Sequence, residues 1–205
     1  MVGSTSPVGV LAFQGDFQKH LELLSAMGRR AVAVRSPEDI ATLAALIIPG
    51  GESTTIGMLM DRFGLIGPVR DRAGDGMPVL GTCAGAILLA GEIDGSDQPR
   101  IGIMDIGVRR NAYGRQIESF EADIELSGPA NRGSAADGAE QPDSIRAVFI
   151  RAPIITRVGS GVDVLARFED DPVVVREGNL MAATFHPELS GETAVHRLFL
   201  RHAGI

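Results

Sequence analysis

The only cysteine of the chain, Cys83, lies between two glycines in the pattern Gly81-x-Cys83-x-Gly85. An apolar run (77–80) precedes this pattern, and a run of small and aliphatic residues (84–90) follows it. The spacing is typical of a nucleophile elbow, a sharp turn from strand to helix in which glycines leave room for a projecting side chain. Backbone N–H groups at such a turn stabilise a thiolate and a developing oxyanion. Cys83 is therefore a candidate nucleophile, and the alternative is a small buried hydrophobic residue.

A cysteine nucleophile needs a base within reach and a group that orients this base. Of the four histidines, His186 directly follows the apolar run 180–185, and Glu188 stands two residues further on. Extended side chains at positions i and i+2 share a face, so Glu188 is placed to hold one imidazole nitrogen while the other nitrogen faces Cys83. The alternative for a His-x-Glu sequence is a solvated pair at the surface.

The other three histidines are expected to lie outside this chemistry. His20 lies in the first expected helix on a different face from its apolar residues, so we expect it at the surface or against a partner. His196 and His202 lie in the polar C-terminal helix, and we expect both on its solvated face.

Glycines and arginines elsewhere in the chain offer groups that suit a binding site. Pro49-Gly50-Gly51 leaves its backbone N–H groups free to point into a site. A phosphate cradle would need the lysine of a Walker A loop, which is absent, whereas an oxyanion hole completed by the N–H of Ala84 suits a thiolate. Arg109-Arg110 and Arg151 are candidate carboxylate binders, with ordinary surface arginines as the alternative. The spacing of His, Cys, Asp and Glu indicates no metal site.

Short apolar runs that alternate with helical patterns must position these residues. Strands buried on both faces of a parallel sheet are expected at 8–13, 31–34, 46–48 and 77–80. Asp16 is a candidate N-cap of the first intervening helix, and Ser53 or Thr54 is a candidate N-cap of a later one. Parallel strands end at one edge of a sheet, so four segments are expected to converge there: 14–16, 49–53, the Cys83 elbow and 186–188.

The second half of the chain has a different character. Apolar and acidic residues alternate with a period of two in 119–126, which indicates an antiparallel strand with one solvated face. Residues 128–144 are rich in Gly, Ala, Pro, Ser and acids, show no periodicity, and are expected to form a surface loop. A final helix is expected at 191–203, and further strands at 101–108, 147–150, 162–168, 173–176 and 180–185.

Composition narrows the class of protein. The 205 residues suit a single domain over 1–205, and with 44% hydrophobic residues the chain can bury a core. A net charge of −7 argues against nucleic acid as a partner. A single cysteine excludes an internal disulfide and is typical of a cytoplasmic protein. Without an apolar run of roughly 20 residues or a basic, apolar leader, neither a membrane span nor secretion is expected.

The motifs together resemble the class I (triad) glutamine amidotransferases, on the segments Pro49-Gly50-Gly51-Glu52-Ser53-Thr54-Thr55, Gly81-Thr82-Cys83-Ala84-Gly85 and Phe185-His186-Pro187-Glu188-Leu189. Residues 110–116 and 149–153 are similar to the glutaminase subunits of pyridoxal 5′-phosphate synthase, the SNO (PdxT) family. The resemblance runs from Val8 to the final helix. It implies a three-layer α/β fold, with a mostly parallel, flavodoxin-like sheet, helices on both faces and a small antiparallel sheet.

The resemblance also implies an activity, the hydrolysis of L-glutamine to L-glutamate and ammonia without a cofactor. Cys83 is then the nucleophile that forms a glutamyl thioester, His186 the general acid and base, and Glu188 the orienting acid. Backbone N–H groups of Gly51 and Ala84 form the implied oxyanion hole. The family's glutamine-binding positions fall on Gly51, Glu52, Ser53, Arg110, Ile150 and Arg151.

In the family, the released ammonia travels to a (β/α)8-barrel synthase subunit (PdxS), which builds the vitamin B6 cofactor pyridoxal 5′-phosphate. The family's partner-facing region falls on Gln14, Gly15, Asp16 and His20. Two other functions stay open. One is the glutaminase subunit of another triad amidotransferase, such as imidazole glycerol phosphate synthase, against which residues 110–116 argue. The other is a non-catalytic regulatory protein on the same scaffold, against which the intact triad argues.

Overall fold

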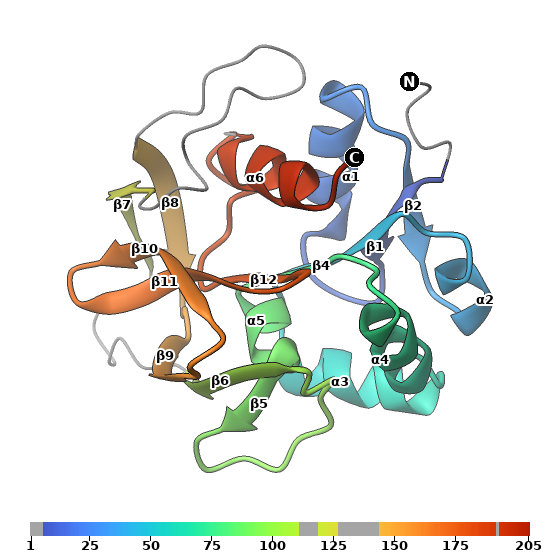
Figure 1. Ribbon diagram of the computed structural model, residues 1–205, viewed down its shortest axis with the longest axis horizontal. Coiled ribbons are helices and arrows are strands. Elements are labelled where there is room, and N and C mark those ends of the chain that lie inside the picture. The colour runs from blue at the N-terminus through green and yellow to red at the C-terminus, as the bar shows by residue number, and fades with distance from the viewer. Residues whose placement is uncertain (1–5, 111–118, 127–143, 192) are drawn as a thin grey trace.

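Short apolar segments form a seven-stranded sheet at the centre of the computed structural model, which describes residues 6–110, 119–126, 144–191 and 193–205 (Figure 1). Five strands run parallel to one another: β1 (Val8–Leu11), β2 (Ala31–Val34), β3 (Ala45–Ile48), β4 (Val79–Thr82) and β12 (Leu180–Ala183). Two antiparallel strands, β10 (Asp163–Phe168) and β11 (Asp171–Glu177), extend one edge, so the strand order is β10-β11-β12-β4-β3-β1-β2. Every residue of β1, β3, β4 and β12 is buried, as expected for strands covered on both faces.

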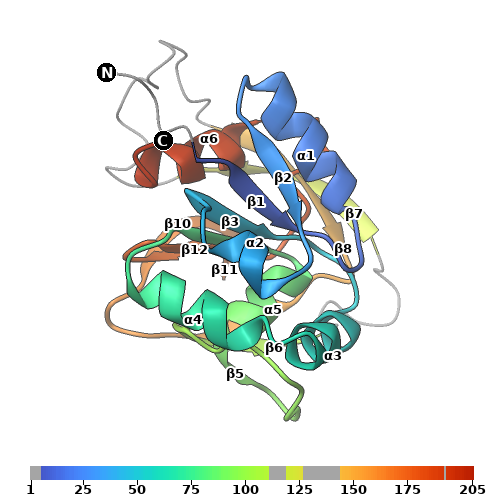
Figure 2. The same ribbon diagram turned by 90° about the vertical axis from the view of Figure 1, so that its right-hand side faces the viewer.

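Helices cover both faces of this sheet, as Figure 2 shows. One face carries α1 (Phe17–Ala26) and α6 (Ala194–His202), and the other carries α3 (Ser53–Arg62), α4 (Ile66–Gly74) and α5 (Ala84–Leu89). The short α2 (Pro37–Ile40) follows β2. Successive residues of β3 point to opposite layers, because Ile47 packs in the core cluster with α1 and α6 whereas Ile48 packs in the cluster with α3 to α5. Burial of each such side chain stabilises the fold by about 1.5–3 kcal/mol. The predicted three-layer, mostly parallel architecture is confirmed.

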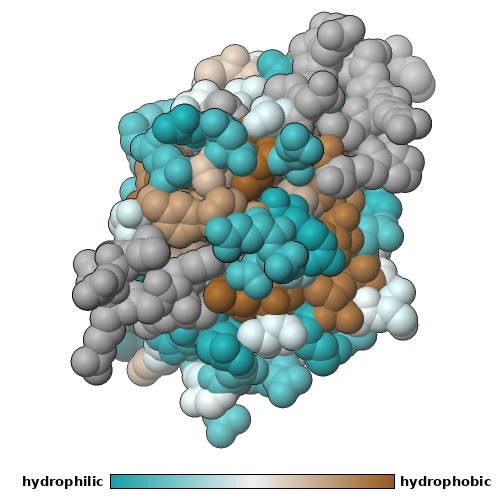
Figure 3. All heavy atoms as spheres, turned by 90° about the vertical axis from the view of Figure 1, so that its left-hand side faces the viewer, coloured by the Kyte–Doolittle hydropathy of each residue, from teal (hydrophilic) through white to brown (hydrophobic). Residues whose placement is uncertain are grey.

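Two smaller sheets lie beside the central one. β5 (Ala90–Ile93), β6 (Met104–Arg109) and β9 (Ile154–Val158) form the first, and β7 (Ser119–Glu125) pairs antiparallel with β8 (Ser144–Ile150) in the second. Ile124 of β7 is buried between the exposed Asp123 and Glu125, so the predicted antiparallel strand with one solvated face is confirmed. Hydrophilic and hydrophobic side chains mix on the surface at this side of the molecule (Figure 3).

The sequence pattern does not predict two of these strands. Ala90 begins β5 directly after α5, where the apolar pattern still indicates a helix, and β9 follows Pro153 without a clear alternation. Both strands pair with β6, β5 in parallel and β9 antiparallel, and no local pattern reveals these pairings. Of the expected surface loop 128–144, residues 128–143 lie outside the described residues, and Ser144 begins β8. Within the described ranges, no helix is both long enough and apolar enough to cross a membrane.

Candidate active site

A cavity of about 380 Å³ opens at the carboxyl edge of the parallel strands. All four segments that were expected to converge contribute to its lining, since β12, β4, β3 and β1 are consecutive neighbours in the sheet. The lining residues are Gln14, Gly15, Asp16, Gly51, Glu52, Ser53, Cys83, Ala84, Ile87, Arg110, Ile150, Arg151 and His186. Of the residues singled out from the sequence for this site, Glu188 and His20 lie behind the cavity rather than in its wall.

Cys83 occupies a strained turn between β4 and α5, as the elbow pattern predicts. Its φ of 48° and ψ of −103° lie in a region that non-glycine residues rarely adopt, and such strain is held at functional sites by the surrounding structure. A Cβ on Gly81 would lie 2.5 Å from the carbonyl carbon of Gly85, and a Cβ on Gly85 would overlap the carbonyl oxygen of Ile48. Both glycines are therefore required by close backbone approach. The Cys83 Sγ lies 3.9 Å from the carbonyl oxygen of Ile150, and the residue is 6% exposed.

His186 and Glu188 form a buried pair next to this sulfur. Nδ1 of His186 lies 2.7 Å from Oε1 of Glu188, which orients the ring, and the backbone N–H of His186 donates to the carbonyl of Val148 at 2.9 Å, which holds the main chain. Burial alone would lower the pKa of His186, but hydrogen bonds and charges from Cys83 and Glu188 outweigh it and raise the pKa to about 10. The imidazole is therefore protonated at neutral pH and places a positive charge beside the Cys83 sulfur.

The carboxylate of Glu188 is ionised in this arrangement. Its burial would raise its pKa, but hydrogen bonds and charges from His186 and His20 hold the pKa well below its usual range. Gly50 makes room for the ring, because a Cβ there would overlap Cε1 and lie 2.9 Å from Nδ1 of His186. A cysteine, a protonated imidazole and a buried carboxylate in this order have the parts of a nucleophilic triad.

The loop after β3 places Gly51 beside Cys83 and Ala84 in the cavity wall. The side chain of Gln14 supports this loop, because its Oε1 accepts from the backbone N–H of Glu52 at 2.7 Å. A Cβ on Gly51 would lie 2.5 Å from that Oε1 and 3.0 Å from Cδ1 of Ile56, so the loop packs closely only with glycine here. This arrangement fits an oxyanion hole built from the two predicted backbone positions.

The predicted N-cap of α3 is wrong. Glu52 caps the helix instead, since its carboxylate accepts from the backbone N–H of Thr54 at 3.2 Å and of Thr55 at 2.7 Å. A carboxylate at the positive end of a helix satisfies two free N–H groups at once. Burial would raise the pKa of Glu52, but the hydrogen bonds from Thr55 and Thr54 lower it below its usual value. The hydroxyls of Ser53 and Thr54 are used elsewhere, because both donate to the side chain of Gln98.

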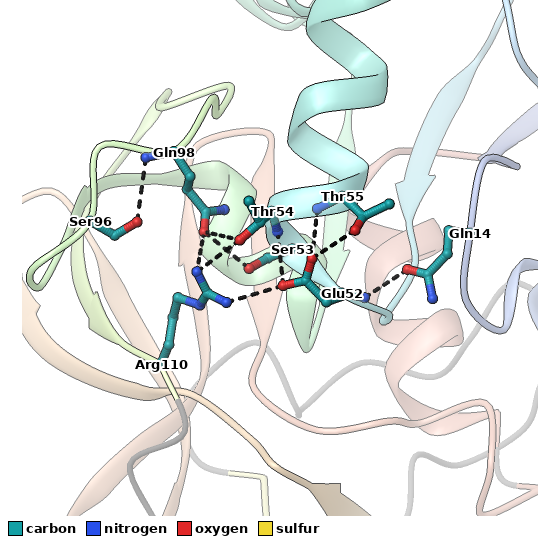
Figure 4. A network of polar contacts seen from close by, with 8 residues as sticks. All are labelled: Gln14, Glu52, Ser53, Thr54, Thr55, Ser96, Gln98 and Arg110. Atoms are coloured by element: carbon teal, nitrogen blue, oxygen red, sulfur yellow. Dashed lines mark hydrogen bonds and ion pairs between the residues drawn. The ribbon is translucent and has the colours of Figure 1, made fainter.

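Arg110 is the centre of a polar network at one end of the cavity (Figure 4). Its guanidinium donates to Oε1 of Gln98 at 2.6 Å, to Oγ1 of Thr54 at 2.9 Å and to Oε1 of Glu52 at 3.1 Å. The sequence reasoning missed Gln98, a buried residue in an irregular segment between β5 and β6 where no periodicity singles it out. Arg109, in contrast, pairs at the surface with Asp94 at 3.1 Å and does not serve the site.

The expectations for His20 and His196 are wrong. His20 and His196 are fully buried and contact each other, Nδ1 to Nε2, at 2.8 Å, so His20 does not face a partner and His196 is not solvated. They meet because α1 and α6 pack on the same face of the sheet. His202 is half-buried, with Nδ1 2.8 Å from the carbonyl of Leu198. Asp16 occupies the N-cap position of α1, but its side chain makes no capping hydrogen bond.

Gln14, Gly15 and Asp16 are exposed at the rim of the cavity, and their predicted contact with a partner stays a prediction. Asp16 also belongs to one candidate metal-ligand group, in which its carboxylate, His186 and Glu188 bring ligand atoms within 4.8 Å of one another. Two members of this group already hydrogen-bond each other, so the donor set is occupied within the protein.

The amino-acid sequence from residue 10 to residue 204 matches the model of the SNO glutamine amidotransferase family. The chain belongs to this family. It is similar to pyridoxal 5′-phosphate synthase subunit PdxT of Pelotomaculum thermopropionicum, with 54% identity over 193 residues that cover 94% of this chain and 93% of the relative. PdxT of Moorella thermoacetica is 50% identical over 197 residues, which cover 96% and 99%.

A solved structure described as a glutamine amidotransferase has the same architecture. It superimposes with a TM-score of 0.87 at 50% sequence identity, and the match covers 97% of this chain and 99% of that one. The family resemblance that the motifs indicate is therefore confirmed over nearly the whole chain, and the cavity described above lies within the matched residues.

Proposed function

We propose that this chain hydrolyses L-glutamine to L-glutamate and ammonia as the glutaminase subunit of a pyridoxal 5′-phosphate synthase. The observation that carries the proposal is the buried His186–Glu188 pair, joined across 2.7 Å and set beside the strained Cys83 in an open cavity. Membership of the SNO glutamine amidotransferase family supports the substrate, and the two PdxT relatives support the assembly.

In the first half of the reaction, the thiolate of Cys83 attacks the side-chain amide carbon of glutamine. The carbonyl oxygen becomes an oxyanion, which the N–H groups of Gly51 and Ala84 stabilise. The imidazolium of His186 gives its proton to the amide nitrogen, the C–N bond breaks, and ammonia leaves. The product on the enzyme is a γ-glutamyl thioester on Cys83.

In the second half, water attacks the thioester carbon while the neutral imidazole of His186 accepts a proton from this water. The C–S bond breaks, the Cys83 thiolate is regenerated, and glutamate leaves. Glu188 holds Nδ1 of His186 throughout and stabilises the imidazolium whenever it forms. No redox change occurs, and the atoms of one water are divided between glutamate and ammonia.

Recognition of glutamine fits the polar end of the cavity. The guanidinium of Arg110 is placed to bind the α-carboxylate, and the carboxylate of Glu52 and the backbone carbonyl of Ile150 suit the α-ammonium group. Ser53 and Arg151, which also line the cavity, complete the binding set. Arg151 has a φ of 44°, so its backbone is held in an unusual conformation at this edge.

The ammonia is passed, in this proposal, to a (β/α)8-barrel synthase subunit in the cytoplasm. The exposed Gln14, Gly15 and Asp16 are the residues at the cavity rim that we assign to this partner. A partner that covers the rim would keep ammonia from escaping and would exclude bulk water from the thioester.

The proposal is tested by glutamate release from the purified chain, alone and with a pyridoxal 5′-phosphate synthase barrel subunit. Wild type is expected to release glutamate, and faster with the barrel subunit, whereas Cys83→Ala is expected to be inactive in both conditions. Arg109→Ala, a change at the neighbouring surface arginine, serves as the matched control with wild-type activity. Activity in Cys83→Ala would overturn the mechanism. A wild-type rate of glutamate release that does not change when the barrel subunit is added would overturn the proposed assembly.

A further inference from the structure

Two buried histidines stand behind the catalytic carboxylate, on the side away from the cavity. His20 of α1 and His196 of α6 are both 0% exposed, and the reaction steps above use neither. Their ring centroids are 5.1 Å apart, with an angle of 49° between the ring planes. Burial of a polar ring costs free energy unless the ring finds polar partners, so the contacts of these two rings need an explanation.

The contacts connect these rings to the triad in a single row. Oε1 of Glu188 takes the hydrogen bond from His186, while Oε2 of Glu188 lies 3.3 Å from Nε2 of His20. The same Nε2 lies 3.3 Å from the hydroxyl of Thr82, the residue before Cys83. Nδ1 of His20 lies 2.8 Å from Nε2 of His196. Oε2 of Glu188 accepts no hydrogen bond of good geometry from the described residues, so its 3.3 Å contact with His20 is a charge–dipole contact.

The positions of the ring hydrogens on His20 and His196 follow from one nitrogen that has no hydrogen-bond partner. Nδ1 of His196 is buried and has no hydrogen-bond partner in the described part of the chain. An unpartnered N–H donor there would be costly, so Nδ1 is the bare nitrogen and Nε2 of His196 carries the hydrogen. His196 then donates to Nδ1 of His20, which leaves the hydrogen of His20 on Nε2, facing Glu188. The reverse arrangement would point the lone pair of His20 at a carboxylate.

A neutral His196 is consistent with this assignment. Burial, together with the neighbouring His20, lowers the pKa of His196 to about 3, although the charge of Glu188 acts in the opposite direction. His196 is therefore the neutral ring at the end of this series of contacts, and it fixes the tautomer of His20. A histidine that orients a charged group is often held in turn by a hydrogen bond to its other ring nitrogen, and His196 holds His20 in this manner.

We propose that His20, held by His196, is a positioning residue of the glutaminase site. Its Nε2–H faces the second oxygen of Glu188 and attracts it, so that the first oxygen stays on His186. The inference rests on the proposed function for its kinetic consequence. Without this contact the carboxylate is free to rotate, and a smaller fraction of molecules presents His186 correctly to Cys83. Neither histidine lines the cavity, so glutamine binding itself is unaffected.

Two amide substitutions separate this role from simple packing. The amide of His20→Gln reaches the place of Nε2 and still meets Glu188, whereas the amide of His20→Asn reaches only the place of Nδ1 and meets His196. We expect His20→Asn to lower kcat about tenfold or more with KM for glutamine unchanged, and His20→Gln to retain most of the wild-type kcat. At His196, Gln is expected to retain more activity than Leu, because the amide of Gln can still donate to His20. Equal kcat values for His20→Asn and His20→Gln, or a change in KM alone, would overturn the inference.

A second readout does not depend on glutamine hydrolysis. Cys83 is the only cysteine, so its alkylation by iodoacetamide in the native protein reports how well His186 supports the thiolate, with Cys83→Ala as the blank. We expect His20→Asn to slow this alkylation several-fold and His20→Gln to leave it near the wild-type rate. If the three proteins show these alkylation rates but wild type never hydrolyses glutamine, the proposed function fails and the positioning role stands. If wild type hydrolyses glutamine and both variants alkylate at the wild-type rate, the positioning role fails alone.

Discussion

The guanidinium of Arg110 donates to the amide oxygen of Gln98 across 2.6 Å, and the same oxygen accepts from the hydroxyls of Ser53 and Thr54. One buried amide thus fixes three side chains at the end of the cavity where we place the α-carboxylate of glutamine. Gln98→Leu keeps the volume but removes the acceptor. Since a hydrogen bond to a charged group contributes about 1.5–3 kcal/mol, we expect KM for glutamine to rise roughly 10- to 100-fold, with kcat much less affected.

Steady-state glutaminase kinetics test this prediction, with Arg109→Ala as the matched control. Arg109 is the neighbouring arginine but pairs with Asp94 at the surface, and its loss is expected to leave KM within about twofold of wild type. A wild-type KM in Gln98→Leu would show that Arg110 does not depend on Gln98.

Glu188→Gln tests the orienting carboxylate. The amide preserves the shape but removes the charge that stabilises the imidazolium of His186, and it allows the wrong tautomer of the ring. We expect kcat to fall about 10²- to 10⁴-fold without unfolding of the protein. Circular dichroism checks the fold and glutamate release checks the rate, and a folded variant with near wild-type kcat would remove Glu188 from the mechanism.

The pKa shift of His186 makes a prediction about stability. The folded-state pKa of about 10 exceeds the ordinary value of 6.5, so the folded state holds this proton more tightly. Its contribution to stability is complete below pH 6.5 and is lost as the pH rises through about 10. The lowered pKa of Glu188 acts in the acid range, where its contribution disappears as the pH falls below the ordinary value of 4.5.

Urea unfolding of wild type and His186→Gln isolates the histidine. The difference in the free energy of unfolding between the two proteins is expected to shrink as the pH rises from about 6 to about 10, because only wild type loses the proton. A difference that stays constant over this range would mean that the imidazole is not protonated in the folded protein.

The elbow can be tested by adding a single methyl group. In Gly85→Ala the new Cβ overlaps the carbonyl oxygen of Ile48, a backbone atom that cannot move aside easily. We expect a loss of about 1–3 kcal/mol in the free energy of unfolding, measured as a lower thermal midpoint. Gly74→Ala in α4 is the matched control, because nothing beyond the chain neighbours and the helix backbone lies within 4 Å of the added Cβ and alanine favours helices. Equal midpoints in the two variants would contradict the close packing at the elbow.

The apolar runs and the strand ends carry most of what the sequence predicts. Ile47 and Ile48 belong to an uninterrupted apolar run, which is typical of a strand covered on both faces. Several such runs together predict the parallel sheet. Parallel topology then brings Cys83 and His186 together without any knowledge of distances. The role of Glu188 as the partner of His186 is predicted from the two-residue spacing between them alone.

Side chains whose partners come from distant elements could not be predicted in the same way. His20 shares the buried face of α1 with Leu24, four residues further on, but a polar residue at such a position reads as exposed. Only the packing of α1 beside α6 supplies its partner His196. Gln98 lies in a segment without periodicity. Glu52 replaces the expected Ser or Thr cap, and its carboxylate also accepts from Arg110, a contact with a distant element.

The central claim, that Cys83 attacks glutamine and carries the glutamyl group, is tested most directly by trapping the intermediate. The wild-type protein with its barrel partner is mixed with L-glutamine, quenched in acid within the first turnovers, and examined by mass spectrometry. We predict that the peptide containing Cys83 gains the mass of one glutamyl group and that the gain disappears at later times and in Cys83→Ala. Turnover of glutamine without any adduct on Cys83, together with release of glutamate by Cys83→Ala, would contradict the account.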